Sequence, residues 1–108
     1  MHARFLIPLL FALSAPAHAA FMTGTQLKQY LDEARNNSSF KGMTVGMGYV
    51  AGVFDMVDRT HVCITQELSA RTAMEIVHTY LSTHRNELEQ PASGLVVKAL
   101  SEEFPCKQ

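Results

Sequence analysis

The chain has 108 residues, of which nine are Lys or Arg and ten are Asp or Glu, so its formal net charge at pH 7 is −1. The basic residues are scattered singly, and the cluster of cations that neutralises phosphates in nucleic-acid binding is missing from the sequence. We therefore expect no nucleic-acid partner. The length is enough for one small domain and too short for two.

The first residues contain the three parts of a secretory signal peptide. Arg4 precedes an apolar run over 5–13, and Ala17-His18-Ala19 has the small residues of a cleavage site. The apolar run is about half of the roughly 20 residues that a membrane-spanning helix needs, and Pro8 interrupts it. We expect cleavage of residues 1–19, a single mature domain over 20–108 and no membrane span after cleavage.

Helical spacing of apolar residues predicts a first and a central helix. The first follows Thr25, a good N-cap residue, and has apolar side chains at positions 27, 30, 31 and 34. The central helix begins between Phe40 and Met43 and ends near Arg59. It is apolar on nearly every side, so we expect it to lie in the middle of the fold.

The second half of the chain predicts two further helices. One follows Ser69 as its N-cap and has an apolar face at positions 73, 76, 77, 80 and 81. The other starts around Pro91, which suits a first-turn position, and ends before Pro105. Because no segment shows the two-residue period of a strand, we predict an all-α fold, a small four-helix bundle.

The glycines of the central helix need an explanation, since each costs about 1 kcal/mol relative to alanine in a helix interior. We expect Gly48 and Gly52 to let neighbouring helices pack closely against the central helix. Leucine at either position would then overpack the fold. Asp55 and Asp58 are expected to mark the solvent-exposed edge of the same helix.

The chain contains two cysteines, Cys63 and Cys106. An even number of cysteines in an exported chain predicts a disulfide. Cys63 precedes the third predicted helix and Cys106 follows the fourth, so the bridge would tie this helical hairpin together. Closing a loop of this length would stabilise the fold by about 4 kcal/mol on a chain-entropy argument.

Two glycine motifs of the central helix match known signatures by letter but not by context. Residues 46–51, GMGYVA, fit the dinucleotide fingerprint, which requires a preceding strand and an acidic residue about 20 positions further on. Gly48 and Gly52 form a G-x-x-x-G pair, but as a membrane dimer motif it would place Asp55 in lipid. Helix packing is the better interpretation of both.

No residue set points to catalysis, a cofactor or a metal. A disulfide removes the cysteine nucleophile that a histidine base could activate. Met43 and Met47 with His61 and Cys63 are suitable copper ligands, but the methionines have the spacing of core residues. The glutamate pairs at 87/89 and 102/103 are interpreted as solvated faces, and His78 as exposed or half-exposed.

A series of motifs in fixed order resembles a known family. The series is Gly48-Tyr49-Val50-Ala51-Gly52-Val53-Phe54-Asp55, then Cys63-Ile64, then Tyr80-Leu81 with His84, then Pro91 to Val96, and finally Phe104-Pro105-Cys106. Together they are similar to the Rap and Tai type immunity proteins of bacterial type VI secretion. The resemblance covers about residues 25 to 106. Eight of the motif residues are also the expected packing residues: Gly48, Tyr49, Gly52, Asp55, Tyr80, Leu81, Phe104 and Pro105.

The resemblance implies a small helical bundle in the periplasm that is not an enzyme. Its partner would be a cognate secreted peptidoglycan amidase, a papain-like cysteine enzyme that the immunity protein binds and inhibits. A homodimer is a further association that we leave open. The alternative function is a small periplasmic binding or chaperone-like helical module without a toxin partner.

The chain departs from the family pattern at two places. Many relatives carry a second cysteine pair near the positions of Leu31 and Gly46. Because this chain lacks that pair, we expect its first helix to be held to the central one by packing alone and to be the least stable part. Relatives also tend to have proline where this chain has Arg85, so we expect the loop that follows to run differently.

That loop, Arg85 to Gln90, is the predicted contact with the partner. It is short, charged and expected to be fixed through the disulfide at the far end of its hairpin, and loops often carry binding function. The candidate contact residues are Arg85, Asn86, Glu87, Glu89 and Gln90. An ordinary solvated turn is the alternative interpretation of the same residues.

Overall fold

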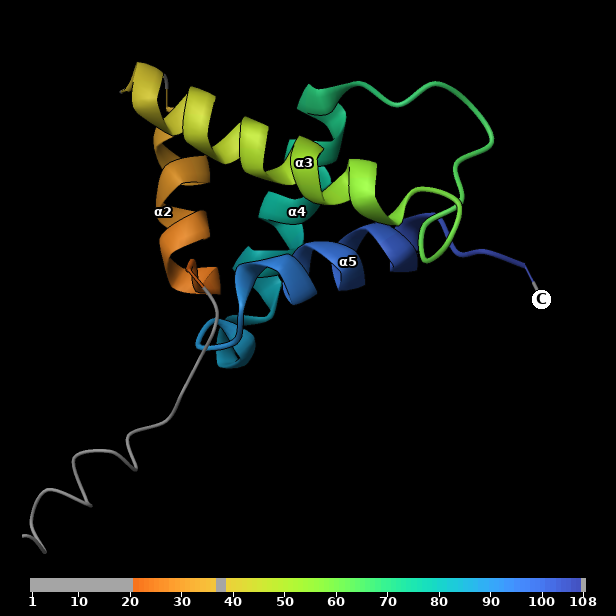
Figure 1. Ribbon diagram of the computed structural model, residues 1–108. Helices are drawn as coiled ribbons and strands as arrows, with labels where there is room; N and C mark the ends of the chain where they lie inside the picture. The colour runs from red at the N-terminus through yellow and green to blue at the C-terminus, as the bar shows by residue number, and fades with distance from the viewer. Residues whose placement is uncertain (1–20, 37–38, 108) are drawn as a thin grey trace, which may run out of the picture.

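The computed structural model describes residues 21–36 and 39–107, so the expected signal peptide at 1–19 lies outside the described residues. The elements follow in the order α2 (Gly24–Arg35), η2 (Gly42–Met47), α3 (Gly48–Val57), α4 (Ala70–Thr83), η3 (Arg85–Glu87) and α5 (Ala92–Glu103). The π-helix η2 runs directly into α3 and forms one rod with it (Figure 1). The predicted all-α fold of four main helices is confirmed.

Helix α2 begins two residues earlier than the sequence suggested. Thr23, and not Thr25, is its N-cap: the Thr23 side chain accepts a hydrogen bond from the Gln26 backbone N–H, and the Gln26 side chain accepts one from the Thr23 N–H. This reciprocal capping box satisfies two donors at once, which decides the start of the helix. The hydroxyl of Thr25 instead donates to the Leu88 carbonyl, 3.4 Å away.

The rod begins with a π-helical segment that packs tightly on α2. A Cβ atom on Gly42 would lie 2.6 Å from Glu33 Cβ and 2.7 Å from the Tyr30 carbonyl oxygen. A Cβ on Gly46 would lie 2.7 Å from Leu31 Cδ2. Both glycines are buried, and they permit the close approach of the two backbones.

The expected packing role of Gly48 and Gly52 is wrong. Both residues are exposed, and a Cβ atom added to either would meet nothing within 4 Å. The expected central burial of the rod is also only partly correct, because Val50 is the buried residue of α3 and Met56 is 80% exposed. The other helices pack on one side of the rod, which leaves its opposite face to solvent.

Helices α4 and α5 start close to the predicted positions. Ser69 caps α4, and its side chain accepts a hydrogen bond of 3.0 Å from the Thr72 N–H, as predicted. Pro91 is the N-cap residue of α5 and not a residue of its first turn, while Phe104 ends that helix. The core is formed by apolar side chains of α2, α3, α4, α5 and the loop after α3, among them Leu27, Leu31, Val50, Val62, Met74, Val77, Leu81, Leu95, Val96 and Leu100.

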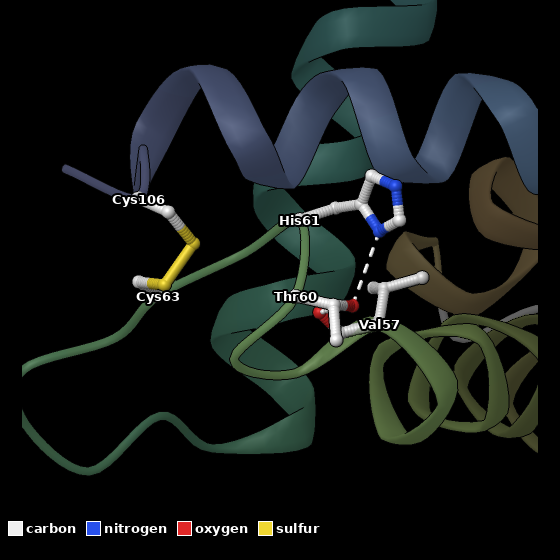
Figure 2. Close-up of a disulfide and its surroundings, with 5 residues drawn as sticks. All are labelled: Val57, Thr60, His61, Cys63 and Cys106. Atoms are coloured by element: carbon white, nitrogen blue, oxygen red, sulfur yellow. Dashed lines mark hydrogen bonds between the residues drawn. A yellow bond between two sulfur atoms is a disulfide. The ribbon is translucent and has the colours of Figure 1, made fainter. Parts of the chain in front are cut away.

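The predicted Cys63–Cys106 disulfide is present, with the two Cα atoms 4.8 Å apart. Figure 2 shows the bridge to one side of the turn that follows α3. In this turn the Thr60 hydroxyl lies within hydrogen-bond distance of the Val57 carbonyl and of His61 Nδ1. Cys63 also donates its backbone N–H to the Phe104 carbonyl, 2.9 Å away. The bridge therefore joins the segment after α3 to the segment after α5, near the end of the chain, and does not clamp the α4–α5 hairpin specifically.

Within the part of the chain that the structure describes, none of the helices combines the length and the apolar character needed to cross a membrane.

Candidate functional site

The predicted contact loop is an ordered turn, which we call the tip and define as residues 85–90. Its first part is the 3₁₀-helix η3, and backbone hydrogen bonds run from Glu87 N–H to the His84 carbonyl and from Gln90 N–H to the Glu87 carbonyl, at 3.0 and 2.9 Å. Four of the five predicted contact residues point to solvent: Arg85, Asn86, Glu89 and Gln90 are exposed.

The fifth, Glu87, supports the tip from inside, so its interpretation as a solvated residue is wrong. The side chain is 19% exposed, and its Oε1 accepts hydrogen bonds from Tyr80 Oη at 2.9 Å and from Lys98 Nζ at 3.2 Å. The bond from Tyr80, together with the nearby Lys98 cation, lowers the pKa of Glu87 below its usual value. Glu87 thereby ties the tip to both α4 and α5.

Tyr80 and His84 extend this support along α4. Burial, followed by the hydrogen bond to the negatively charged Glu87, raises the pKa of Tyr80 to about 12. The ring of His84 stacks on the Tyr80 ring with centroids 3.8 Å apart and planes inclined by 9°. The tyrosine and histidine of the family motif therefore form the base on which the tip stands.

The N-terminus of α2 holds the tip from the other side. Gly24 N–H donates to the Gln90 carbonyl at 2.9 Å and Thr25 N–H donates to the Leu88 carbonyl at 3.0 Å. A further bond of 2.9 Å joins Ala92 N–H to the Met22 carbonyl. Sequence reasoning attributed the rigidity of the loop to the disulfide, but these backbone bonds act at the loop itself, whereas the bridge lies by the opposite end of α5 (Figure 1).

A polar cluster joins α2 to α4 next to the core. His78 is 8% exposed, so the expectation of an exposed side chain is wrong: α2 covers it. His78 Nε2 lies 2.7 Å from Asp32 Oδ1, and Nδ1 lies 3.1 Å from Arg35 Nη1. A guanidinium can only donate, so Nδ1 accepts and the Nε2–H donates to Asp32. Helix α2 is thus held by polar bonds to α4 as well as by packing.

Ion pairs surround this cluster. Arg35 Nε lies 3.2 Å from Glu75 Oε1, and Lys28 Nζ lies 3.0 Å from Asp32 Oδ2. Burial opposes ionisation of Asp32, but the hydrogen bonds from His78 and Lys28 outweigh it and lower the pKa of this carboxyl. Each charged side chain of the cluster has a partner of opposite charge. These bonds help to hold α2 against α4.

The remaining motif residues divide between core and surface. Tyr80 and Leu81 are buried, Tyr49 and Phe104 are half-buried, and Asp55 and Pro105 are exposed with Gly48 and Gly52. Among the residues that the structure describes, no three His, Cys, Asp or Glu side chains gather to hold a metal ion. Both cysteines are in the disulfide. The tip, with its supported base and exposed polar rim, is the feature that suits the binding of a protein surface.

Comparison with known proteins agrees with this architecture. A search of curated proteins finds no match. A family model described as Rap1a immunity proteins matches residues 23–106. The matched range contains all the helices from α2 to α5, both cysteines and the tip. The chain therefore belongs to the Rap1a immunity protein family.

Proposed function

We propose that the chain is a periplasmic immunity protein that binds and inhibits a peptidoglycan amidase delivered by type VI secretion. Membership of an immunity protein family supports the binding of a cognate effector protein. The signal-peptide pattern of residues 1–19 supports export, and the resemblance of the motifs to Rap and Tai type proteins supports the amidase as the target. Inhibition needs no catalytic group, because covering a substrate cleft is sufficient.

The observation that carries this proposal is the rigid tip. Its backbone is bonded to the N-terminus of α2, and Glu87 ties it to Tyr80 and Lys98. Nevertheless Arg85, Asn86, Glu89 and Gln90 remain exposed. A surface that is ordered before binding loses little conformational entropy on association, which favours tight binding. The tip would contribute the polar rim of the contact.

The function is tested first by asking whether a small cysteine amidase is encoded beside the gene for this chain, and then with that amidase as the candidate effector. A small cysteine amidase directed to the periplasm of a bacterial host should lyse the cells, and the full-length chain should prevent lysis. A variant without residues 1–19 should fail to protect although it still binds the amidase in vitro, because it stays in the cytoplasm. Lysis that the full-length chain does not prevent, or no binding of the purified proteins, would favour the alternative of a module without a toxin partner.

The role of the tip is tested with matched triple variants. Arg85→Ala/Asn86→Ala/Glu89→Ala removes exposed groups and spares Glu87, whose loss would disturb the tip itself. We expect the Kd for the amidase to rise at least tenfold, about 1.4 kcal/mol, measured by titration calorimetry. An unchanged Kd would exclude the tip from the contact while leaving the immunity function standing.

The control for that experiment is Gln66→Ala/Glu67→Ala/Arg71→Ala. These residues are exposed in the loop before α4 and in its first turn. Like the tip variant, the control replaces one arginine, one glutamate and one neutral amide side chain, so neither variant changes the net charge. The control should bind the amidase with the wild-type Kd. An equal loss of affinity in both triple variants would point to a general effect of charge or solubility.

A further inference from the structure

A groove runs along the outer side of the α4–α5 pair. One hollow of about 280 Å³ and a second of about 240 Å³ share the lining residues Ile76, Thr79 and Glu103, so they are continuous. The groove extends from Thr72 near the start of α4 to His84 at its end. It reaches the tip, but none of the five predicted contact residues lines it.

The floor of the groove is apolar and its wall is acidic. Ile76 is half-buried and Ala99 is buried at the floor. Glu102 and Glu103 line it from α5 and are exposed, and no ion pair of the described residues involves either of them. No Lys or Arg lines either hollow in the described structure.

The negative charge of Glu102 on α5 acts on Tyr80 in the groove. Tyr80 lines the groove, and its pKa is raised first by burial, then by Glu87, and also by the negative charge of Glu102. Glu75, on the other wall, is the acidic lining residue that already has a cationic partner, Arg35. The α5 wall of the groove is therefore electronegative, and no ion pair of the described residues neutralises Glu102 or Glu103.

We propose that the α4–α5 groove docks a cationic segment of the effector protein, with an aliphatic side chain on Ile76 and a Lys or Arg between Glu102 and Glu103. This inference rests on the proposed function. Complementary charge would select the segment and speed its encounter, while the apolar floor would supply contact area. Because the groove reaches His84, a partner seated on the tip could occupy both surfaces at once.

The test compares two charge reversals, each changing the net charge equally. Glu103→Lys lies in the groove, and its control, Glu67→Lys, lies in the exposed loop before α4. We expect the Kd for the amidase to rise at least tenfold for Glu103→Lys and less than twofold for Glu67→Lys. We also expect added salt to weaken binding of the wild type more steeply than binding of Glu103→Lys. Equal Kd values for both variants would overturn the groove while the immunity function stands.

A neutral variant separates steric from electrostatic effects. Thr79→Trp fills the groove at an exposed position, so the fold should be retained, which circular dichroism verifies. It should weaken amidase binding as Glu103→Lys does. Wild-type affinity in Thr79→Trp would contradict occupation of the groove. A wild-type dimer in sedimentation experiments that Thr79→Trp dissociates would overturn the proposal in favour of a second copy as the occupant.

A peptide probe keeps the groove testable if the amidase does not bind at all, which would be a failure of the proposed function. A short peptide of alternating Leu and Lys is titrated into the labelled protein and compared with its Leu/Glu counterpart. Amide shifts at Ile76, Thr79 and Glu103 with the Leu/Lys peptide alone would support the groove. Shifts that are absent, or equal for both peptides, would overturn it.

Discussion

Exchanging glycine for alanine at two positions of the same rod should have opposite effects on stability. Gly42 faces α2, and a Cβ atom there would lie 2.7 Å from the Tyr30 carbonyl oxygen and 3.0 Å from the Ala34 backbone nitrogen. Gly48 faces solvent, and a Cβ there would meet nothing within 4 Å. The two substitutions add the same methyl group and differ only in what that group meets.

The magnitudes follow from two opposing terms. Alanine is favoured over glycine in a helix interior by about 1 kcal/mol, so Gly48→Ala should stabilise the protein by up to about that amount. At Gly42 the methyl group meets backbone atoms, which cannot rotate away, and overpacking of this kind costs about 1 to 3 kcal/mol or more. Gly42→Ala should therefore be destabilising overall because α2 and the rod must move apart.

Urea unfolding followed by far-ultraviolet circular dichroism measures both changes. We expect the midpoint to rise for Gly48→Ala and to fall for Gly42→Ala, with similar slopes. Gly52→Ala should behave like Gly48→Ala, since its Cβ also meets nothing within 4 Å. Stability of Gly42→Ala equal to or above the wild type would refute the close approach of α2 and the rod.

Three further changes test the bridge and the two charged clusters. Cys63→Ser should lower the free energy of unfolding by about 4 kcal/mol and leave one titratable thiol, whereas two thiols in unreduced wild-type protein would contradict the disulfide. Glu87→Gln should lower the pKa of Tyr80 from about 12, since the carboxylate raises it, as measured by NMR of labelled tyrosine; an unchanged value would leave burial and the charge of Glu102 as its causes. The folded pKa of Asp32 is depressed, so its carboxylate stabilises the fold above the unfolded pKa, and this contribution is lost as the pH falls through the folded pKa. Asp32→Asn should therefore reduce the loss of urea stability on acidification, and a wild-type slope would argue against this assignment.

Local patterns were sufficient to predict where the helices lie. Ser69 and the apolar face behind it identify α4 because a cap and a helical period are both properties of neighbouring residues. The start of α2 could also have been predicted correctly from the sequence, since Thr23 followed by Gln26 is a capping-box pattern. The π-helical turn of η2 carries no comparable signal, and it accompanies the packing of the rod against α2.

Which face of a helix meets its neighbours was not available from local pattern. Gly42 and Gly46 form one pair four residues apart and Gly48 and Gly52 another, so spacing alone gives no reason to choose between them. The choice depends on where α2 lies. Likewise, His78 was interpreted as exposed or half-exposed, and it is buried because α2 covers that side of α4.

The sequence predicted which segment forms the candidate site, but not what each residue of that segment does. Charge and length identified the residues after His84, and the exposed Arg85 and Asn86 agree with a surface role. The inward position of Glu87 depends on Tyr80 and Lys98, which come from two different helices. The bonds from the start of α2 join residues far apart in sequence, and no short-range pattern announces them.

The disulfide divides the chain into two parts that respond differently to a protease. Its bridge makes residues 63–106 a covalent ring that contains α4, the tip and α5, while α2 and the rod lie outside the ring. A single cut inside the ring leaves both fragments joined until the bridge is reduced, whereas a cut between α2 and η2 leaves α2 attached by noncovalent contacts alone. The tip thus lies inside a ring that one proteolytic cut cannot divide into separate pieces, and a protease must cut the ring twice before any part of it can leave.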